Sequence, residues 1–385
     1  MRYESARLAD FSAVSGKPRR RGFDTTFFLL VVVLLTLGVI MVLSSSYARA
    51  YYDPGNITGG NAAYYFIRQL LFALLGVCAM LFASRIPMVF YRRTAFYFLG
   101  AVLILLLLVP FIGVKANGAR RWLGVGGLTV QPSELAKLAV IISFSALICR
   151  MRGKMRAFRY GILPFGAILL VVVGLLILEP HFSASIIIIA IGAVMLFIGG
   201  VGLGWFIAAF SVVGMALAVI LMFFPYPSSR ISTWHDPFSS SADEGYQIVQ
   251  SLYSIGSGGL TGLGLGGSRQ KFLYLPEEHN DFIFSVVCEE LGFIGAALIL
   301  VLFALLILRG YWIALHMNDR FSFLLCTGII TLLAIQVFLN VAVVTNLIPC
   351  TGISLPFFSY GGTALLIELF EMGIILGASR DVLTK

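Results

Sequence analysis

Four ionisable residues stand close together where a polar segment passes directly into an apolar helix. The segment YLPEEHNDFIF, which starts at Tyr274, contains Glu277, Glu278, His279 and Asp281. An ionisable side chain at the mouth of a membrane helix loses hydration, which costs free energy unless the group is paired or used. We therefore predict that Asp281 is the catalytic residue, and that Glu277 and His279 contact the substrate.

Opposing effects act on the carboxyl group of Asp281. The dipole of the helix that follows favours the carboxylate by about 0.3–1 kcal/mol, whereas burial can raise the pKa of an acid by up to about 3–5 units. Glu277 and Glu278 act in the same direction as burial. We expect a raised pKa, suited to a general base, provided that no cation pairs directly with Asp281. The alternative is a helix cap or one half of a structural ion pair.

A metal site at Asp281 needs more ligands than the sequence offers. His279 and Asp281 are two residues, which is too few, and a histidine in a loop is more often a hydrogen-bonding partner. We therefore predict no metal ligands there, and no cofactor is indicated. A divalent cation stays open as an accessory to the reaction.

Positively charged residues in the outer segments suit an anionic ligand. Lys115, Arg120 and Arg121 lie outside in the topology given below, against the usual bias of Lys and Arg toward the cytoplasm. Arginine offers a fixed fork of donors that matches phosphate. Arg269 and Lys271 follow a glycine-rich segment and are further candidates. The alternative is contact with lipid headgroups.

A second charged pair opens another apolar segment. Glu134 and Lys137 are three residues apart, which places them on one face of a helix, where they can form an ion pair. Such a pair can simply neutralise itself so that the helix inserts. Alternatively, it faces the same polar cavity as Asp281 and contacts the substrate.

The composition excludes a soluble fold. Of the 385 residues, 59% are hydrophobic and 12% are charged, whereas soluble domains carry about 25% charged residues. A bilayer core requires about 20 apolar residues of each helix. We therefore predict an all-α, polytopic membrane protein of about ten transmembrane helices, at 26–47, 62–84, 94–113, 133–150, 161–178, 183–200, 205–224, 281–308, 323–345 and 360–379.

The distribution of Lys and Arg orients these helices. With both termini in the cytoplasm, 18 of the 27 Lys and Arg residues lie inside and seven outside, as the positive-inside rule requires. Residues 1–25 are then a basic cytoplasmic tail, 26–379 the membrane domain and 380–385 a short cytoplasmic tail. The net charge of +9 reflects flanks that face anionic membrane lipid, and it does not indicate nucleic-acid binding.

The longest outer loop, 225–280, joins the seventh and eighth predicted helices. Loops of this length usually carry function. Its apolar residues between Tyr246 and Ile255 are spaced as in an amphipathic helix, which we expect to lie on the membrane or over the mouth of the bundle. Seven glycines follow between Gly256 and Gly267. Without a glycine-lysine-serine/threonine sequence they are no nucleotide loop, and we expect tight turns or close approach to a substrate.

Several motifs, in order, resemble the SEDS (shape, elongation, division and sporulation) family of peptidoglycan glycosyltransferases, represented by FtsW, RodA and SpoVE. They are NGARRWLGVGGLTVQPSELAK from Asn117, SRISTWHDPF from Ser229, GYQIVQSLYSIGSGGLTGLGLGGSRQKFLYLPEEHNDFIF from Gly245 and LPFFSYGG from Leu355. Trp234, Asp236 and Pro237 are more similar to the FtsW and SpoVE branch. The resemblance implies that Ser359 and Tyr360 lie near the substrate cavity.

The chain departs from the family pattern at a few positions. His181 stands after Pro180, where family members commonly have aspartate. Thr351 stands where some FtsW proteins have lysine, so no cationic role is transferred to it. Glu368 and Glu371 lie in the last predicted helix, where family members often have uncharged residues, and the sequence offers no role for them. Glu289 and Glu290 are expected to face the interior of the bundle.

The resemblance implies a polymerase of lipid II at the outer face of the bacterial cytoplasmic membrane, serving division or sporulation septum synthesis. Its implied partner is a class B penicillin-binding protein, a single-pass transpeptidase, together with other divisome proteins. From the residues alone we infer only an outward-facing membrane site for an anionic ligand. The alternatives are a lipid II flippase, in which Glu134, Lys137, Glu179 and Glu289 line a path, and a non-catalytic divisome scaffold.

Overall fold

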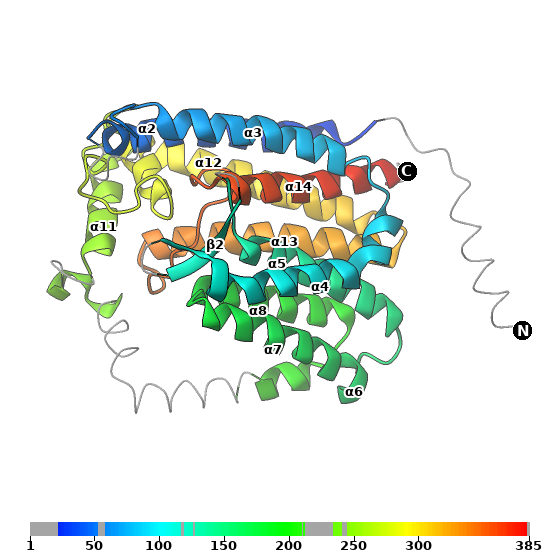
Figure 1. The fold of residues 1–385 in the computed structure, drawn as a ribbon. Coiled ribbons are helices and arrows are strands. Elements are labelled where there is room, and N and C mark those ends of the chain that lie inside the picture. The colour runs from blue at the N-terminus through cyan, green and yellow to red at the C-terminus, as the bar shows by residue number, and fades with distance from the viewer. Residues whose placement is uncertain are drawn as a thin grey trace, which may run out of the picture.

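A computed structural model describes residues 22–52, 58–116, 119–125, 128–209, 211, 234–240 and 245–382. The described part is a bundle of long helices that run side by side (Figure 1). In chain order its helices are α2 (Thr25–Tyr52), α3 (Tyr64–Ala83), α4 (Met88–Ile112), α5 (Pro132–Arg150), α6 (Phe158–Gly161), α7 (Leu163–Leu178), α8 (Phe182–Gly199), α11 (Tyr246–Gly258), α12 (Ile283–Leu315), α13 (Arg320–Val344) and α14 (Gly362–Ala378).

The all-α membrane architecture predicted from the sequence is confirmed. Within the described residues, nine helical segments are long and apolar enough to cross a membrane, and each matches one predicted span. Most of the predicted span 205–224 lies outside the described residues. The helices α5 and α13 are mostly buried, whereas α3, α4 and α7 expose apolar side chains, as expected of lipid-facing helices.

One local feature was not predicted: a small antiparallel sheet in the second outer loop. It consists of β1 (Val114–Ala116), β2 (Ala119–Val125) and β3 (Leu128–Val130), in the order β1-β2-β3. Thr363 donates a hydrogen bond to the carbonyl of Thr129 at 2.9 Å, which ties β3 to the start of α14. The sheet is therefore seated on the bundle.

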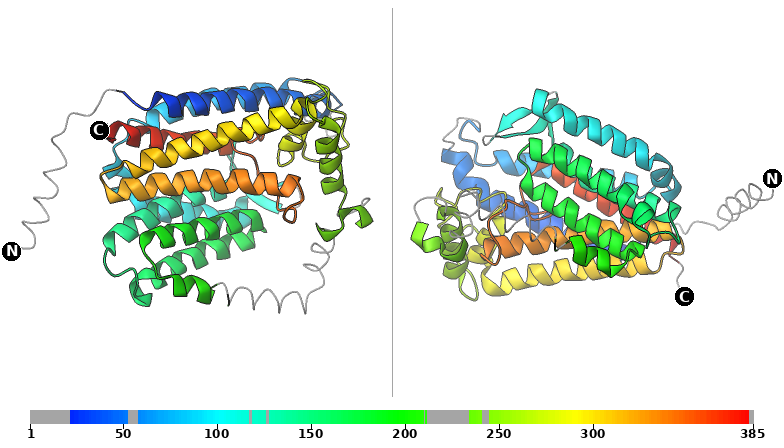
Figure 2. Two further views of the ribbon diagram at one scale, coloured as in Figure 1. Left: turned by 180° about the vertical axis from the view of Figure 1, so that it is seen from behind. Right: turned by 90° about the horizontal axis from the view of Figure 1, so that it is seen from below.

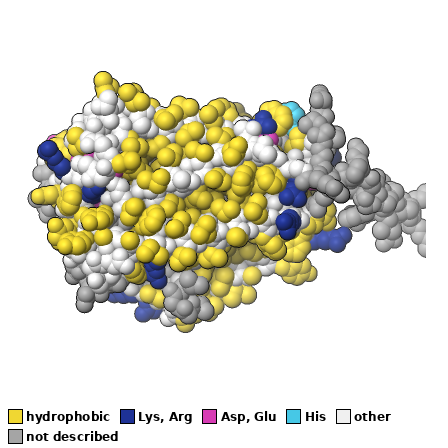
Figure 3. Space-filling model, turned by 90° about the horizontal axis from the view of Figure 1, so that it is seen from above, with side chains coloured by type: hydrophobic (Ala, Val, Ile, Leu, Met, Phe, Trp, Pro, Cys, Tyr) yellow, Lys and Arg dark blue, Asp and Glu magenta, His cyan; other side chains and the backbone are white. Residues whose placement is uncertain are grey.

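The two described chain ends lie together at one end of the bundle, and the sheet and α11 lie at the other (Figures 1 and 2). Hydrophobic side chains cover the middle of the surface, and Lys and Arg gather toward the two ends (Figure 3). At the end with the termini, Arg309 binds Asp24 at 2.6 Å. The orientation in the membrane stays a prediction, and we call the end with the sheet and α11 the outer end in accordance with it.

Helix α11 lies across the outer end of the bundle, over the ends of the membrane-spanning helices (Figure 1). Its buried face includes Ile248, Val249 and two serines. Ser251 lies 2.7 Å from the hydroxyl of Ser285, and Ser254 donates to Glu289 at 2.9 Å. The amphipathic helix predicted from the sequence is thus confirmed, and it packs on α12 over the bundle mouth.

The glycine-rich segment after α11 fills a break in α12. At Gly292 the backbone of α12 leaves the helical conformation, with a φ of 68°. The N–H groups of Phe293 and Ile294 donate to the carbonyls of Gly259 and Leu260, at 2.9 and 3.1 Å. Each buried backbone group must find a partner, so the glycines serve close approach to another part of the backbone. The close approach of these glycines to a substrate stays a prediction.

Two buried glutamates of α12 hold the segment that follows. Glu289 accepts hydrogen bonds from the hydroxyl of Ser268 at 2.6 Å and from the N–H of Arg269 at 2.9 Å. Glu290 pairs with Lys271 at 2.9 Å, and Ser44 of α2 also donates to it at 2.7 Å. Both glutamates face the interior, as predicted, and they anchor the outer loop to the bundle.

We predict that Gly373 is required for the close packing of α14 on α3. A Cβ atom at Gly373 would lie 2.8 Å from the Cβ of Ala83 and closer still to the carbonyl oxygen of Met80. Gly373→Ala should therefore destabilise the protein by about 1–3 kcal/mol, measured as a lower melting temperature in detergent. Gly100→Ala on α4 is the matched control, because nothing lies within 4 Å of its Cβ position. Equal melting temperatures for the two variants would contradict this packing.

Candidate functional site

Asp281 lies in a turn at the outer end of the bundle, two residues before the start of α12. Three consecutive carbonyl groups of that turn each accept a hydrogen bond from another segment. The N–H of Tyr360 donates to His279 at 2.8 Å, and the hydroxyl of Ser359 donates to Asn280 at 2.8 Å. The side-chain amide of Asn340 donates to the carbonyl of Asp281, also at 2.8 Å. These bonds fix the backbone that carries Asp281.

Asn340 joins the turn that carries Asp281 to the segment that follows α13. Its side chain is fully buried in α13, and its Nδ2 atom also donates to the carbonyl of Ile353 at 2.7 Å. The adjacent Gly352 has a φ of +67°, and a Cβ there would lie 3.1 Å from Oδ2 of Asp281. The segment after α13 thus passes directly beside the carboxyl group of Asp281.

The carboxyl group of Asp281 is held in place without being neutralised. No described residue makes a hydrogen bond or an ion pair with its side-chain oxygens, and the residue is half-buried. Burial and then Glu277 raise the pKa of Asp281, His279 and Arg121 oppose them, and the net result is a pKa of about 6. The direction expected from the sequence is the one found. A group with this pKa can accept a proton near neutral pH.

Glu278 has a partner that the sequence analysis missed. Its carboxylate forms a two-pronged ion pair with Arg49 of α2, at 2.6 and 2.8 Å. Burial alone would raise the pKa of Glu278, but His279 and Arg49 lower it below its ordinary value. Because Glu278 is neutralised in this way, Glu277 is the acid that acts on Asp281. The sequence places Arg49 229 residues from Glu278, so no local pattern indicated this pair.

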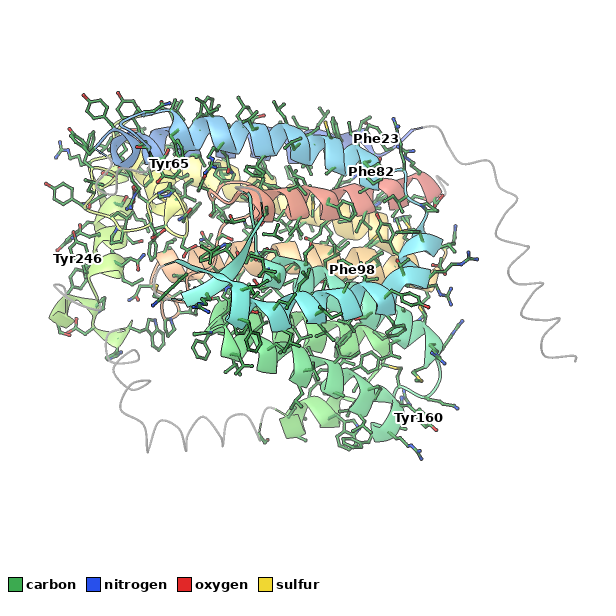
Figure 4. The ribbon with its side chains drawn as sticks, in the orientation of Figure 1. Phe23, Tyr65, Phe82, Phe98, Tyr160 and Tyr246 are labelled. Atoms are coloured by element: carbon green, nitrogen blue, oxygen red, sulfur yellow. The ribbon has the colours of Figure 1, made fainter. Side chains whose placement is uncertain are left out.

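His279 packs among aromatic rings next to the turn. Its ring centroid lies 4.8 Å from that of Tyr65 and 5.8 Å from that of Tyr360. Figure 4 labels Tyr65 at the outer end of α3. Gln69, also on α3, donates to the carbonyl of Ser359 at 3.2 Å. The predicted residues His279, Ser359 and Tyr360 therefore do lie together beside Asp281, where α3 supports them.

The two arginines of β2 have different surroundings. Arg121 donates to the carbonyl of Pro180 at 2.6 Å, and its charge acts on Asp281, Glu179 and His181. Arg120 donates instead to the carbonyls of Pro110 and Phe111 at the end of α4. Neighbouring residues in a strand point to opposite sides. Arg121 is thus the β2 cation near Asp281, whereas Arg120 caps α4.

The other predicted cations are not gathered at Asp281. Lys271 is a correction: its ammonium group is buried against Glu290, so this structure does not present it to a phosphate. Lys137 is buried and pairs with Glu134 at 2.6 Å, as predicted. Lys115 and Arg269 have exposed side chains on the outer loops. Among the predicted cations, Arg121 is the one whose charge reaches Asp281.

The turn between α7 and α8 carries two further buried ionisable groups. Burial raises the pKa of Glu179 to about 8, although Arg121 opposes this. Burial, with Arg121 and then Lys137, lowers the pKa of His181 to about 3. Ser183 donates a hydrogen bond to the carbonyl of Thr351, which ties this turn to the segment beside Asp281. The turn therefore belongs to the wall of the site.

The site shows no preformed metal cage. Within the described ranges, no group of three or more His, Cys, Asp or Glu residues is arranged to hold a metal ion. Arg49, Gln69 and Asn340 are the residues that sequence reasoning missed. Each is polar within or at the end of an apolar helix, which is a signal for an interior role but does not name the partner.

Comparison with known proteins gives a consistent result over almost the whole chain. The family model FTSW_RODA_SPOVE, described as "Cell cycle protein", matches residues 24–383. The stage V sporulation protein E of Bacillus subtilis is 39% identical over 349 residues, which cover 90% of this chain and 94% of the relative. The probable peptidoglycan glycosyltransferase FtsW of Trichlorobacter lovleyi is 40% identical over 363 residues, covering 94% of each chain.

The fold also matches an experimental structure. A chain in the structure described as "Structural coordination of polymerization and crosslinking by a peptidoglycan synthase complex" superimposes with a TM-score of 0.78. It is 28% identical, and the match covers 95% of this chain and 100% of that chain. The similarity therefore includes the helices that surround Asp281 as well as the motifs.

We predict that Asn340→Leu loosens the turn that carries Asp281. The substitution keeps the approximate volume but leaves the carbonyls of Asp281 and Ile353 without their donor. The expected cost is about 1–3 kcal/mol, seen as a lower melting temperature, with faster amide hydrogen exchange over 277–283 and 353–361. Thr327→Val, on the same helix, is the matched control, because the Thr327 hydroxyl is buried without a partner. The assignment fails if exchange in both segments is unchanged by Asn340→Leu.

Proposed function

The chain belongs to the FtsW/RodA/SpoVE family, and on this premise we propose that it is a peptidoglycan glycosyltransferase that polymerises lipid II. Its relative in Trichlorobacter lovleyi bears the name of that activity. The observation that carries the proposal is the Asp281 carboxyl group, which is fixed by its backbone, unpaired, and raised in pKa to about 6. This is what a general base at the outer face of the membrane needs.

In the proposed reaction Asp281 takes the proton from the 4-hydroxyl of an N-acetylglucosamine unit. That oxygen then bonds to the anomeric carbon of an N-acetylmuramic acid unit, while the bond from that carbon to the pyrophosphate oxygen breaks. The leaving group is undecaprenyl pyrophosphate, and the proton stays on Asp281 until it passes to water. The energy comes from the activated donor, so no nucleotide is required on the outer side.

Arg121 is the candidate to stabilise the pyrophosphate as it leaves. Its guanidinium group lies close enough to act on Asp281 and yet does not pair with it. Donors directed at developing charge are worth most where water is excluded. Arg68 of α3 is a second candidate, because its charge acts on Tyr360. Glu277, His279, Ser359 and Tyr360 would line the sugar-binding part of the site.

We further infer that the chain works beside a class B penicillin-binding protein. The solved synthase complex contains a chain with the same fold, and the description of that complex couples polymerization to crosslinking. The helix α12 exposes a row of large apolar side chains, including Leu298, Val301, Leu305 and Leu308. A single apolar helix of a partner could pack there, and lipid would cover the same face otherwise.

The rival functions are lipid II transport and a scaffold role in the divisome. A relay through Glu289 is not favoured, because Glu289 accepts hydrogen bonds from Ser254, Ser268 and Arg269 and so anchors the outer loop. Glu134 and Lys137 neutralise each other. We therefore place catalysis first. Movement of labelled lipid II across vesicles without glycan product would instead support transport.

We predict that Asp281→Asn abolishes polymerisation and leaves the fold intact, because the amide keeps the shape of the carboxyl group but cannot accept the proton. The assay is glycan chain formation from purified lipid II, with the class B penicillin-binding protein added. The loss should be at least about 10²–10⁴-fold, with lipid II binding retained. Asp381→Asn, an exposed residue at the opposite end of the bundle, is the matched control. Absence of product from wild type and both variants would reject the proposed activity.

The pH dependence of the rate should report the ionisation of Asp281. The base works only when it is ionised, so kcat should fall about tenfold per pH unit below its pKa of about 6 and level off above it. Glu277→Gln removes a negative charge that raises this pKa, so the acidic limb should move to lower pH. The Gln side chain keeps the oxygen that accepts from Asn280. An unmoved acidic limb in Glu277→Gln would mean that the limb does not belong to Asp281.

A further inference from the structure

The interior of the bundle contains a second group of charged side chains, separate from Asp281. Glu134 and Lys137 lie on α5, and Glu368 and Glu371 lie on α14, in each case three residues apart on one helical face. All four residues are buried, with at most 9% of their surface exposed. Helices α5 and α14 pack against each other, and the charges that act on Glu371 are those of Lys137, Glu368 and Glu134, so the four residues form one cluster.

The charges in this cluster do not balance if every group is ionised. Three carboxylates would face one ammonium group, and only Glu134 forms an ion pair with Lys137, at 2.6 Å. A buried carboxylate without a counter-ion is far less stable than a protonated one. The ordinary pKa of glutamate lies only about three pH units below neutral pH. Protonating the glutamates therefore costs less free energy than burying them as unpaired carboxylates.

The hydrogen bonds point in the same direction. Glu371 is 4% exposed, and no residue in the described ranges makes a hydrogen bond to its carboxyl group. Glu368 accepts a single bond, from the N–H of Phe357 at 3.2 Å. An ionised carboxylate at this depth would need several donors. One donor for two carboxyl groups is too few for two negative charges.

No other cation of the neighbouring helices compensates for the two glutamates. Helix α14 packs against α2, α3, α5, α12, α13, β3 and the short 3-10 turn Ser379–Asp381. The cations on these elements have other surroundings. Arg49 binds Glu278, Arg68 binds the hydroxyl of Tyr64, and Arg309 binds Asp24. Arg320 donates to the carbonyl of Gly199, Arg380 donates to the hydroxyl of Ser84, and Arg150 is exposed. Glu289 and Glu290 bind the outer loop, through Ser268, Arg269 and Lys271. Lys137 is thus the one described cation that acts on Glu368 and Glu371.

We propose that Glu134, Lys137, Glu368 and Glu371 form a proton-binding site inside the bundle, in which Glu134 is ionised against Lys137 while Glu368 and Glu371 each hold a proton at neutral pH. The protons come from water, and no other reactant is involved. The site is connected to the catalytic turn. Phe357, whose N–H binds Glu368, lies in the same segment as Ser359 and Tyr360, which hold the carbonyls of Asn280 and His279.

Infrared spectroscopy of the full-length protein in lipid nanodiscs at neutral pH tests this assignment directly. Protonated carboxyl groups absorb separately from carboxylates, and their band shifts in D₂O. We expect Glu371→Gln and Glu368→Gln each to remove part of the protonated-carboxyl band. Both variants should melt at the wild-type temperature, because glutamine is neutral like the protonated acid. Asp381→Asn, at an exposed position, should leave the band unchanged.

A band of equal intensity in wild type, Glu368→Gln and Glu371→Gln would overturn the proposal. So would a melting temperature that sodium ions raise in wild type, relative to choline, and do not raise in Glu371→Gln, because a metal cation would then occupy the site. If the glutamine variants fail to accumulate, Glu371→Asp replaces them, and a shift in band frequency is the expected result. None of these measurements uses lipid II, so they stand or fall independently of the proposed activity.

Discussion

The site depends on how one carboxyl group is held in position without being neutralised. Asp281 is fixed through its backbone: the carbonyls of His279, Asn280 and Asp281 accept bonds from Tyr360, Ser359 and Asn340. Since none of these bonds uses the side-chain oxygens, the carboxyl group keeps its basicity while the turn is rigid. A salt bridge to the side chain would have fixed it equally well but would have lowered its pKa.

Around this turn, buried ion pairs attach the outer loops to the membrane helices. Arg49 of α2 binds Glu278, and Lys271 binds Glu290 of α12. Such pairs gain little stability over apolar packing, but removing one partner leaves an unpaired charge and is costly. They therefore act mainly to specify position. The first joins the turn before α12 to a helix 229 residues away in sequence, and the second fixes the outer loop to the helix that follows it.

The membrane imposes a second constraint, which the break in α12 illustrates. Backbone groups freed at Gly292 cannot bond to water, and so the glycine-rich segment supplies their partners. Glycine is needed because a side chain at Gly262 would collide with the backbone around Gly292. Hydrogen-bond donors are also scarce around Glu368 and Glu371, which have one donor between them. Their charge state therefore depends on whether they bind protons.

The sequence by itself determined the class of the protein, the positions of its spans and the identity of Asp281 as the candidate base. These follow from local properties: hydrophobic length, the distribution of Lys and Arg, and motifs that are continuous along the chain. Only the tertiary structure decided which charges meet. Arg120 and Arg121 are neighbours in sequence, but the strand directs them to different partners. Lys271 forms an ion pair with Glu290 and does not reach Asp281. Pairings such as Asn340 with Asp281, 59 residues apart, depend on how the helices pack, which no local pattern specifies.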